Sequence, residues 1–190
     1  LTACGIKVWW DKFCLEPGMP WEEGFCNGLA NSRYFVPLLS REAINSSTAS
    51  NRNFERLAKD SPCDNVFLEH RLALELRAMG LIEDIFPVLV GDEFNDTFSN
   101  YHATGCHPLR TQDVVVEKVE LKVREHLDRQ GLGAPIDTAI TVSAVLEKLL
   151  SNREGYIEGP KQFAFQQVID QLVKAVEKSR EVVIEDNNDD

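Results

Sequence analysis

The chain has little basic charge, and this scarcity narrows the range of its partners. It carries 20 lysine and arginine residues against 31 aspartate and glutamate residues, which gives 190 residues a formal net charge of -11. Such a surface repels the phosphates of nucleic acids and the anionic headgroups of membranes unless basic residues cluster locally. The sequence shows no such cluster. We therefore expect neither a nucleic acid nor a membrane surface as a partner.

Long apolar runs, close cysteine pairs and common nucleotide-binding motifs are also missing. No run approaches the roughly 18 apolar residues of a membrane span, and no signal peptide opens the chain. The five cysteines stand at irregular spacing without the CxxC pairs of a zinc site. Reduced thiols in a cytoplasmic protein are the expectation. Neither a P-loop nor a GxGxxG motif is present.

A metal site is not expected either. His102, Cys106 and His107 lie close together in a predicted loop. Loop histidines without a second close pair of ligands are usually solvated rather than metal-bound.

The apolar residues that are present predict one α/β domain. With 43% hydrophobic residues, the chain can form a real core. Short strands are predicted at residues 6–11, 33–40 and 84–92, separated by helices that begin near Trp21 and Asp64. Strands and helices that alternate in this way indicate an open sheet. The continuous apolar character of the second and third strands is typical of parallel strands covered on both faces, although Pro37 indicates an edge or a bulge.

The second half of the chain is mainly helical in its pattern. A helical run begins near Val116 and ends before Gly131, and a short helix follows at residues 142–150. A short strand at residues 155–159 and a last helix at 165–176 with a core-facing stripe are also predicted.

Glu69 is the residue that most needs an explanation. At about 100° per residue, a helix over 64–76 places this carboxylate between apolar side chains. Those side chains are Leu68, Leu72, Leu76, Met79, Ala73 and Val66. Burying an unpaired carboxylate costs several kcal/mol, so Glu69 is either neutralised by Arg71, Arg77 or another basic residue, or kept for a ligand.

Several consecutive segments resemble a TIR (Toll/interleukin-1 receptor) domain. Residues 10–18 are similar to the second strand and BB loop of the family, in which an aspartate is followed by an L-x-x-G pattern. Residues 21–40 resemble the second helix and third strand, and residues 85–91 resemble the fourth strand. Residues 65–76 resemble the segment that carries the conserved glutamate of TIR enzymes.

The resemblance implies a flavodoxin-like α/β fold, an open parallel sheet with helices on both faces and the strand order 2-1-3-4-5. It implies a TIR-like domain over residues 1–180, with a helical insertion at about 93–154 before the last helix, and an acidic tail at 181–190, which we expect to be disordered. The first strand of the family has no counterpart in this sequence. We expect that a longer protein supplies it, or that it exists outside this numbering.

TIR enzymes cleave the bond between nicotinamide and ribose in NAD, and the resemblance implies the same activity here. The chain would be an NAD+ nucleosidase that forms nicotinamide and ADP-ribose or a cyclic form, with NAD as a substrate and no further cofactor. Glu69 would be the catalytic residue, because a desolvated carboxylate stabilises an oxocarbenium-like ribose.

The residues that would bind the substrate are less strongly indicated. Ligands of open α/β sheets bind beyond the carboxyl ends of the strands, so Asp11, Ser40 and Asp92 are expected at the rim of the cleft. Trp10 or Phe13 would stack on the substrate. Asn65 departs from the family pattern, because many TIR enzymes have tryptophan four residues before the glutamate.

Two other functions remain open. TIR domains that only assemble carry a glutamate at this position too, so the chain is alternatively a non-catalytic signalling module. It would then bind other TIR domains, as a homo-oligomer, through the BB loop formed by Leu15, Glu16, Pro17 and Gly18, in which Pro17 pre-sets a turn that Gly18 completes. A third interpretation is a regulator that holds NAD without cleaving it.

Overall fold

A computed structural model of the chain describes residues 5–40, 54–90, 92–94, 97–99, 113–137, 139–150, 166 and 169–178. The predicted strand at 155–159, the His102, Cys106 and His107 group and the acidic tail at 181–190 lie outside these residues.

Two parallel two-stranded ladders make up the parallel part of the sheet structure in the described residues. β1 (Tyr34–Phe35) pairs with β3 (Asp84–Ile85), and β2 (Leu38–Ser40) pairs with β4 (Val88–Val90). The two ladders lie in line and are separated at Pro37 and Pro87, which have no backbone N–H to donate. The N–H of Val88 donates to the carbonyl of Pro37 at 2.9 Å and keeps the strands in register across this break. The sequence indicated an edge or a bulge at Pro37, and the structure has a break between two ladders at this position.

A short hairpin follows the parallel strands. β5 (Asp92–Phe94) and β6 (Thr97–Ser99) pair antiparallel, with Asp92 opposite Ser99. The sequence analysis expected a helical insertion from about residue 93 and did not predict this hairpin.

The strand predicted at residues 6–11 is not formed, and that prediction was wrong. Residues 6–10 are irregular, and α1 (Asp11–Cys14) begins where the strand was expected to end. A strand gains its hydrogen bonds only from a neighbour, and none of the strands in the described residues pairs with this segment. Trp9 packs instead on α2 (Trp21–Ala30), where its ring lies 2.5 Å from the position that a Cβ atom on Gly28 would occupy.

The predicted helices are confirmed. α4 (Asn65–Ala78) begins after Asp64, whose carboxylate accepts a hydrogen bond from the N–H of Phe67 at 2.8 Å. Gly80, with φ at +76°, follows its last turn. A short 3-10 helix, η2 (Phe54–Arg56), precedes it. α5 (Glu117–Arg129) and α6 (Val142–Leu150) coincide with the two helical patterns of the second half.

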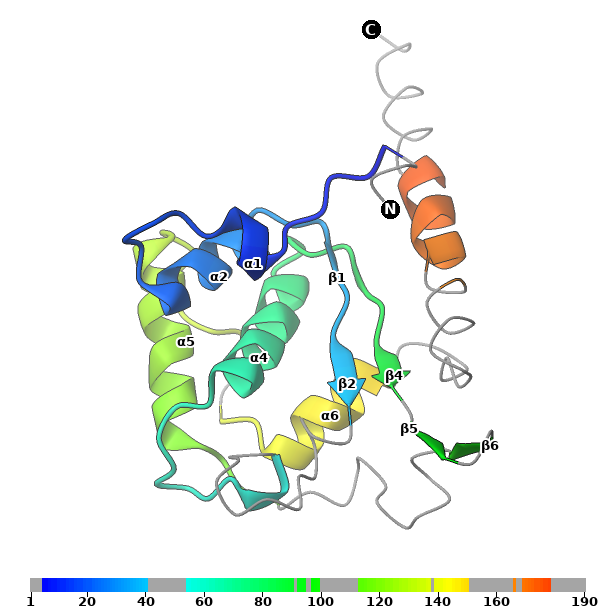
Figure 1. Ribbon diagram of the computed structural model, residues 1–190. Helices are drawn as coiled ribbons and strands as arrows, with labels where there is room; N and C mark the ends of the chain where they lie inside the picture. Colours follow the sequence, from blue (N-terminus) through cyan, green and yellow to red (C-terminus); the bar gives the residue numbers. More distant parts are fainter. Residues whose placement is uncertain are drawn as a thin grey trace, which may run out of the picture.

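Helices cover both faces of the sheet, as expected for strands that are apolar throughout (Figure 1). α2, α5 and α6 pack around α4 in one large core, which also contains Leu39 and Ile85 of the sheet. Helical residues 169–178 cover the other face, where Leu172 packs against Phe86 and Val88. The predicted α/β fold class is therefore confirmed.

Candidate functional site

Glu69 lies in the second turn of α4, as the fifth residue of that helix. α4 begins at the end of the molecule toward which β2 and β4 point (Figure 1). Its side chain is half-buried. The pKa of the Cys26 thiol on α2 is raised, chiefly by burial and then by the negative charges of Glu22 and Glu69. The Glu69 carboxylate is thus near α2 and partly shielded from water.

The two arginines considered as partners of Glu69 contact other acids. Arg77 lies 3.4 Å from Asp84 through its Nη2 atom. Arg71 forms ion pairs with two buried glutamates of the core.

Three other predicted residues lie at the same end of the sheet. Ser40 is the last residue of β2 and is paired with Val90 of β4. Asp92, two positions after Val90, is the first residue of β5. Asn65 is the first residue of α4. Their roles stay predictions.

Asp11, Trp10 and Phe13 lie elsewhere. They belong to α1 or precede it directly, and α1 lies beside α2 near the end of the molecule where β1 begins (Figure 1). The exposed fractions are 54% for Trp10 and 74% for Phe13, and their ring centroids are 4.9 Å apart. The structure therefore does not place these three residues at the strand ends, and their part in binding substrate also stays a prediction.

The BB loop forms the turn that its sequence predicts. The N–H of Met19 donates to the carbonyl of Glu16 at 3.1 Å, and Gly18 adopts a φ of +88°. Proline followed by a residue with positive φ is typical of a type II turn. Glu16, Pro17 and Gly18 are exposed.

A comparison with protein families matches residues 1–114, more than half of the chain, to the family described as TIR domain. The chain belongs to the TIR-domain family. Comparisons with curated proteins and with solved structures found no match. TIR domains in general act in signal transduction and interact with other TIR domains.

Other features of the described part of this TIR domain bear on its chemistry. No helix in it is long and apolar enough to cross a membrane. Within the same residues, no group of three His, Cys, Asp or Glu side chains could hold a metal ion. Cys14, Cys26 and Cys63 are free thiols.

The TIR domain contains a buried charged network that the sequence analysis missed. Arg71 is 0% exposed and donates from Nε to Glu120 at 2.8 Å, from Nη1 to Glu75 at 2.8 Å and from Nη2 to the carbonyl of Asp137. Glu75 also accepts hydrogen bonds from the backbone N–H groups of Ile136 and Asp137. The network therefore fixes α4 to α5 and to the loop before α6.

Two carboxylates share one guanidinium in this network. Burial alone would lower the pKa of Arg71, but the hydrogen bonds and charges of Glu120 and Glu75 outweigh it and raise the pKa. The spacing of Arg71 and Glu75, four residues apart, was a local signal for one of the pairs. Glu120 is 49 positions away from Arg71, and no sequence pattern indicated that pair.

His70 is a second buried polar residue that was not predicted. It is 3% exposed and lies between the rings of Phe35 and Phe54, both at right angles to it within 5.7 Å. Its Nδ1 contacts the carbonyl of Val66, which can only accept a hydrogen bond. The neutral ring therefore carries its proton on Nδ1, and Nε2 has no hydrogen-bond partner among the described residues.

We expect His70 to make the TIR domain sensitive to acid. Burial lowers the pKa of His70 from 6.5 to about 4. Because the pKa of His70 is lower in the folded state than in the unfolded chain, the folded state is favoured above pH 6.5. This contribution to the free energy of unfolding, roughly 3 kcal/mol in total, is lost as the pH falls toward 4. Urea unfolding at several pH values measures this loss. In the variant His70→Leu, this part of the pH dependence should disappear, and parallel pH profiles for the two proteins would contradict the account.

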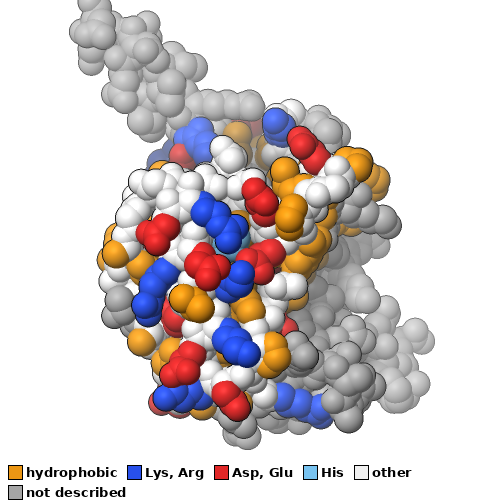
Figure 2. All heavy atoms as spheres, turned by 90° about the vertical axis from the view of Figure 1, so that its left-hand side faces the viewer, with side chains coloured by type: hydrophobic (Ala, Val, Ile, Leu, Met, Phe, Trp, Pro, Cys, Tyr) orange, Lys and Arg blue, Asp and Glu red, His pale blue; other side chains and the backbone are white. Residues whose placement is uncertain are grey.

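Polar contacts also join α2 to α5. Glu22 accepts from Lys122 at 3.1 Å and from His126 at 2.9 Å. Burial would raise the pKa of Glu22, but the contacts with Lys122 and His126 outweigh it and lower the pKa. Figure 2 shows basic and acidic side chains side by side over this face of the molecule. α5 is therefore held both by the buried network and by these surface contacts.

Proposed function

We propose that this TIR domain is an NAD+ nucleosidase that releases nicotinamide and forms ADP-ribose or a cyclic product. One observation carries the proposal: Glu69 is half-buried in the second turn of α4, a helix that begins at the end of the molecule toward which β2 and β4 point (Figure 1). Ligands of open α/β sheets bind beyond the carboxyl ends of the strands. NAD is the substrate, and no further cofactor is proposed.

The reaction needs electrostatic stabilisation more than proton transfer. The bond between the nicotinamide nitrogen and ribose C1′ breaks with its electron pair going to the nitrogen, so nicotinamide leaves as a neutral molecule. Positive charge then grows on the ribose, and a carboxylate shielded from water stabilises such charge strongly. Water adds to C1′ and loses a proton to solvent, which gives ADP-ribose. An internal nucleophile of the nucleotide would give the cyclic form instead.

Glu69 is the catalytic residue in this proposal, and other side chains would position the substrate. Asn65 lies one turn before Glu69 on α4, where its amide could donate to the leaving base or the ribose. Ser40 at the end of β2 would hydrogen-bond the substrate. The exposed rings of Trp10 and Phe13 offer a stacking surface, and we propose that Asp11 contacts the substrate beside them. For these residues to reach a substrate at the strand ends, α1 would have to move there, or a second TIR domain would have to supply its own α1.

Nicotinamide release by the intact chain tests the proposal. Chromatography measures the rate of nicotinamide release from NAD. We expect this rate to rise more steeply than in proportion to the protein concentration, because a site that is completed between copies depends on assembly. Absence of nicotinamide at every concentration, including those at which light scattering shows assembled protein, would contradict the enzyme proposal.

The alternative is a non-catalytic scaffold that self-associates through the BB loop, and the exposure of Glu16, Pro17 and Gly18 favours it. A scaffold would assemble without consuming NAD. In the variant Gly18→Val, valine would be strained at a φ of +88°, so the mass of the assembly measured by light scattering should fall. The regulator interpretation predicts a third result, in which calorimetry detects NAD binding and the bound NAD stays intact. The free thiols of Cys14, Cys26 and Cys63 support a cytoplasmic location for any of these functions.

A further inference from the structure

Residues 5–19, which we call the arm, contribute little to the packed part of the domain. In the part of the chain that the structure describes, none of them belongs to either apolar core. Its large apolar side chains are exposed instead, from 37% for Trp9 to 74% for Phe13. The hydrogen bonds of the arm in the same described part, such as that from the N–H of Met19 to the carbonyl of Glu16, join its own residues to each other. The arm therefore has few of the contacts that make a segment locally stable.

Two glycines of α2 hold the arm. Gly24 and Gly28 are buried and four residues apart, so they lie on the same side of the helix. The ring of Trp9 lies 2.5 Å from the position of a Cβ atom on Gly28, and the end of the Leu15 side chain lies against the same position on Gly24. A methyl group at Gly28 would have to displace a rigid ring, whereas the flexible side chain of Leu15 can rotate away from Gly24. The contact between Trp9 and Gly28 is therefore the firmer of the two.

The turn between α1 and α2 gives the arm a place to pivot. Glu16, Pro17 and Gly18 are exposed. α2 follows this turn and is fixed in the core by Phe25 and Leu29. Rotation about the turn can thus move α1 while α2 stays in place.

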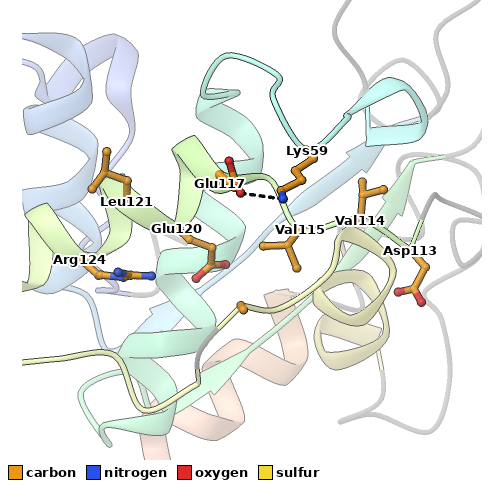
Figure 3. Close-up of a pocket in the computed structure, with 9 residues that line it drawn as sticks. Lys59, Asp113, Val114, Val115, Glu117, Glu120, Leu121 and Arg124 are labelled. Carbon is orange, nitrogen blue, oxygen red and sulfur yellow. Dashed lines mark ion pairs between the residues drawn. The ribbon is translucent and has the colours of Figure 1, made fainter.

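The arm is not a lid over the cavity beside α5. That cavity has a volume of about 760 Å³ and is lined by Lys59 and by residues between 113 and 139, none of which belongs to the arm (Figure 3). Release of the arm therefore changes the surroundings of α1 and α2 and leaves this cavity as it is.

We propose that the arm has two positions and that the contact between Trp9 and Gly28 selects between them. In the resting position, this contact keeps α1 beside α2. When Trp9 leaves Gly28, α1 swings about the turn and carries Trp10 and Phe13 to the strand ends. This inference rests on the proposed function, which needs both rings at the NAD site. The resting contact then keeps the enzyme inactive.

Gly28→Ala in the intact chain tests the contact. Alanine is a better helix former than glycine, so the variant should unfold at no lower temperature than the unaltered chain. Its methyl group should nevertheless displace Trp9 and release the arm. Trypsin cleavage after Lys12, within α1, should become at least about tenfold faster, because cleavage follows the population of the released segment. Mass spectrometry of the fragments measures this rate.

Three further variants show whether the effect passes through Trp9. Trp9→Ala should accelerate the cleavage to a similar extent, because it removes the ring from the other side of the contact. Adding Gly28→Ala to Trp9→Ala should then have no further effect, since both substitutions remove one interaction. Glu23→Ala, at an exposed position of the same helix, should leave the rate unchanged.

Nicotinamide release tests what the movement does. At a low protein concentration, we expect Gly28→Ala to release nicotinamide about tenfold faster than the unaltered chain, in step with the released fraction of the arm. Equal cleavage after Lys12 in the two proteins would overturn the proposed contact. Faster cleavage without faster nicotinamide release, in a chain that cleaves NAD, would overturn the movement of α1 to the site. If neither protein releases nicotinamide, the enzyme proposal fails, and the tryptic cleavage still decides whether Trp9 holds the arm.

Discussion

Arg71→Ala should lower the free energy of unfolding of this TIR domain by about 3–5 kcal/mol, the range for breaking a buried ion pair from one side. Arg71 and Glu75 are 0% exposed and Glu120 is 5% exposed. Without the guanidinium, two carboxylates remain buried with one fewer cation to balance them. The carbonyl of Asp137 also loses its donor. Urea unfolding at pH 7, followed by circular dichroism, measures the change.

Arg129→Ala is the matched control. Arg129 is also on a helix with a glutamate four residues away, but its side chain is 52% exposed and its distance to Glu125 is 3.7 Å. Its removal should change the free energy of unfolding by no more than about 0.5 kcal/mol. A loss below about 1 kcal/mol for Arg71→Ala would show that the network is not a principal support of α4 and α5.

Glu69→Gln should lower kcat/KM for NAD cleavage by at least about 100-fold, the effect of removing one group that stabilises transition-state charge. The amide keeps the size of the carboxylate and can still accept a hydrogen bond from ribose, but it cannot balance the growing positive charge. The loss should therefore appear mainly in kcat, with little change in KM. Initial rates of nicotinamide formation over a range of NAD concentrations separate the two constants.

Glu147→Gln provides the control for this substitution. Glu147 is an exposed residue of α6 that the account gives no role, so its variant should retain the rate of the unaltered chain. Both variants should unfold at the temperature of the unaltered chain to within a few degrees. If Glu69→Gln retains full activity in a folded protein, Glu69 is not the catalytic residue.

The helices could be predicted from the sequence because the residues that begin and end a helix, and the spacing of its apolar side chains, lie within the helix or next to it. Asp64 and Gly80 are near neighbours of α4 and mark its two ends. The helical run predicted from Val116 carries Val119, Val123 and Leu127 at helical spacing, and all three lie on the buried side of α5 with 0% exposure. Pro37 in the strand at 33–40 likewise indicated an irregular position, and the two parallel ladders are separated there.

Features that depend on distant partners were not predictable in this way. The strand pattern at residues 6–11 has the right residues, but a strand forms only beside another strand, and the sequence does not specify that neighbour. α4 is enclosed by α2, α5 and α6, so its charged residues do not mark an exposed side. The burial of Arg71 depends on Glu120 from another helix.

The candidate site was predicted in part for the same reason. Asn65 and Glu69 lie in the first two turns of α4 and Ser40 is the last residue of β2, as the predicted order of helix and strand requires, and their part in binding substrate stays a prediction. Trp10 and Phe13 were assigned to the strand ends through the strand at 6–11. Because this strand is not formed, they lie beside α2 instead.

The most direct measurement for the central claim is a single turnover with the assembled protein in excess over NAD, stopped at short times and analysed for nicotinamide. The account predicts that the unaltered chain converts all bound NAD to nicotinamide, while Glu69→Gln, assembled to the same extent and binding NAD with similar affinity, releases almost none on that timescale. Equal rates of nicotinamide release from the two proteins, or NAD left intact by both, would contradict it.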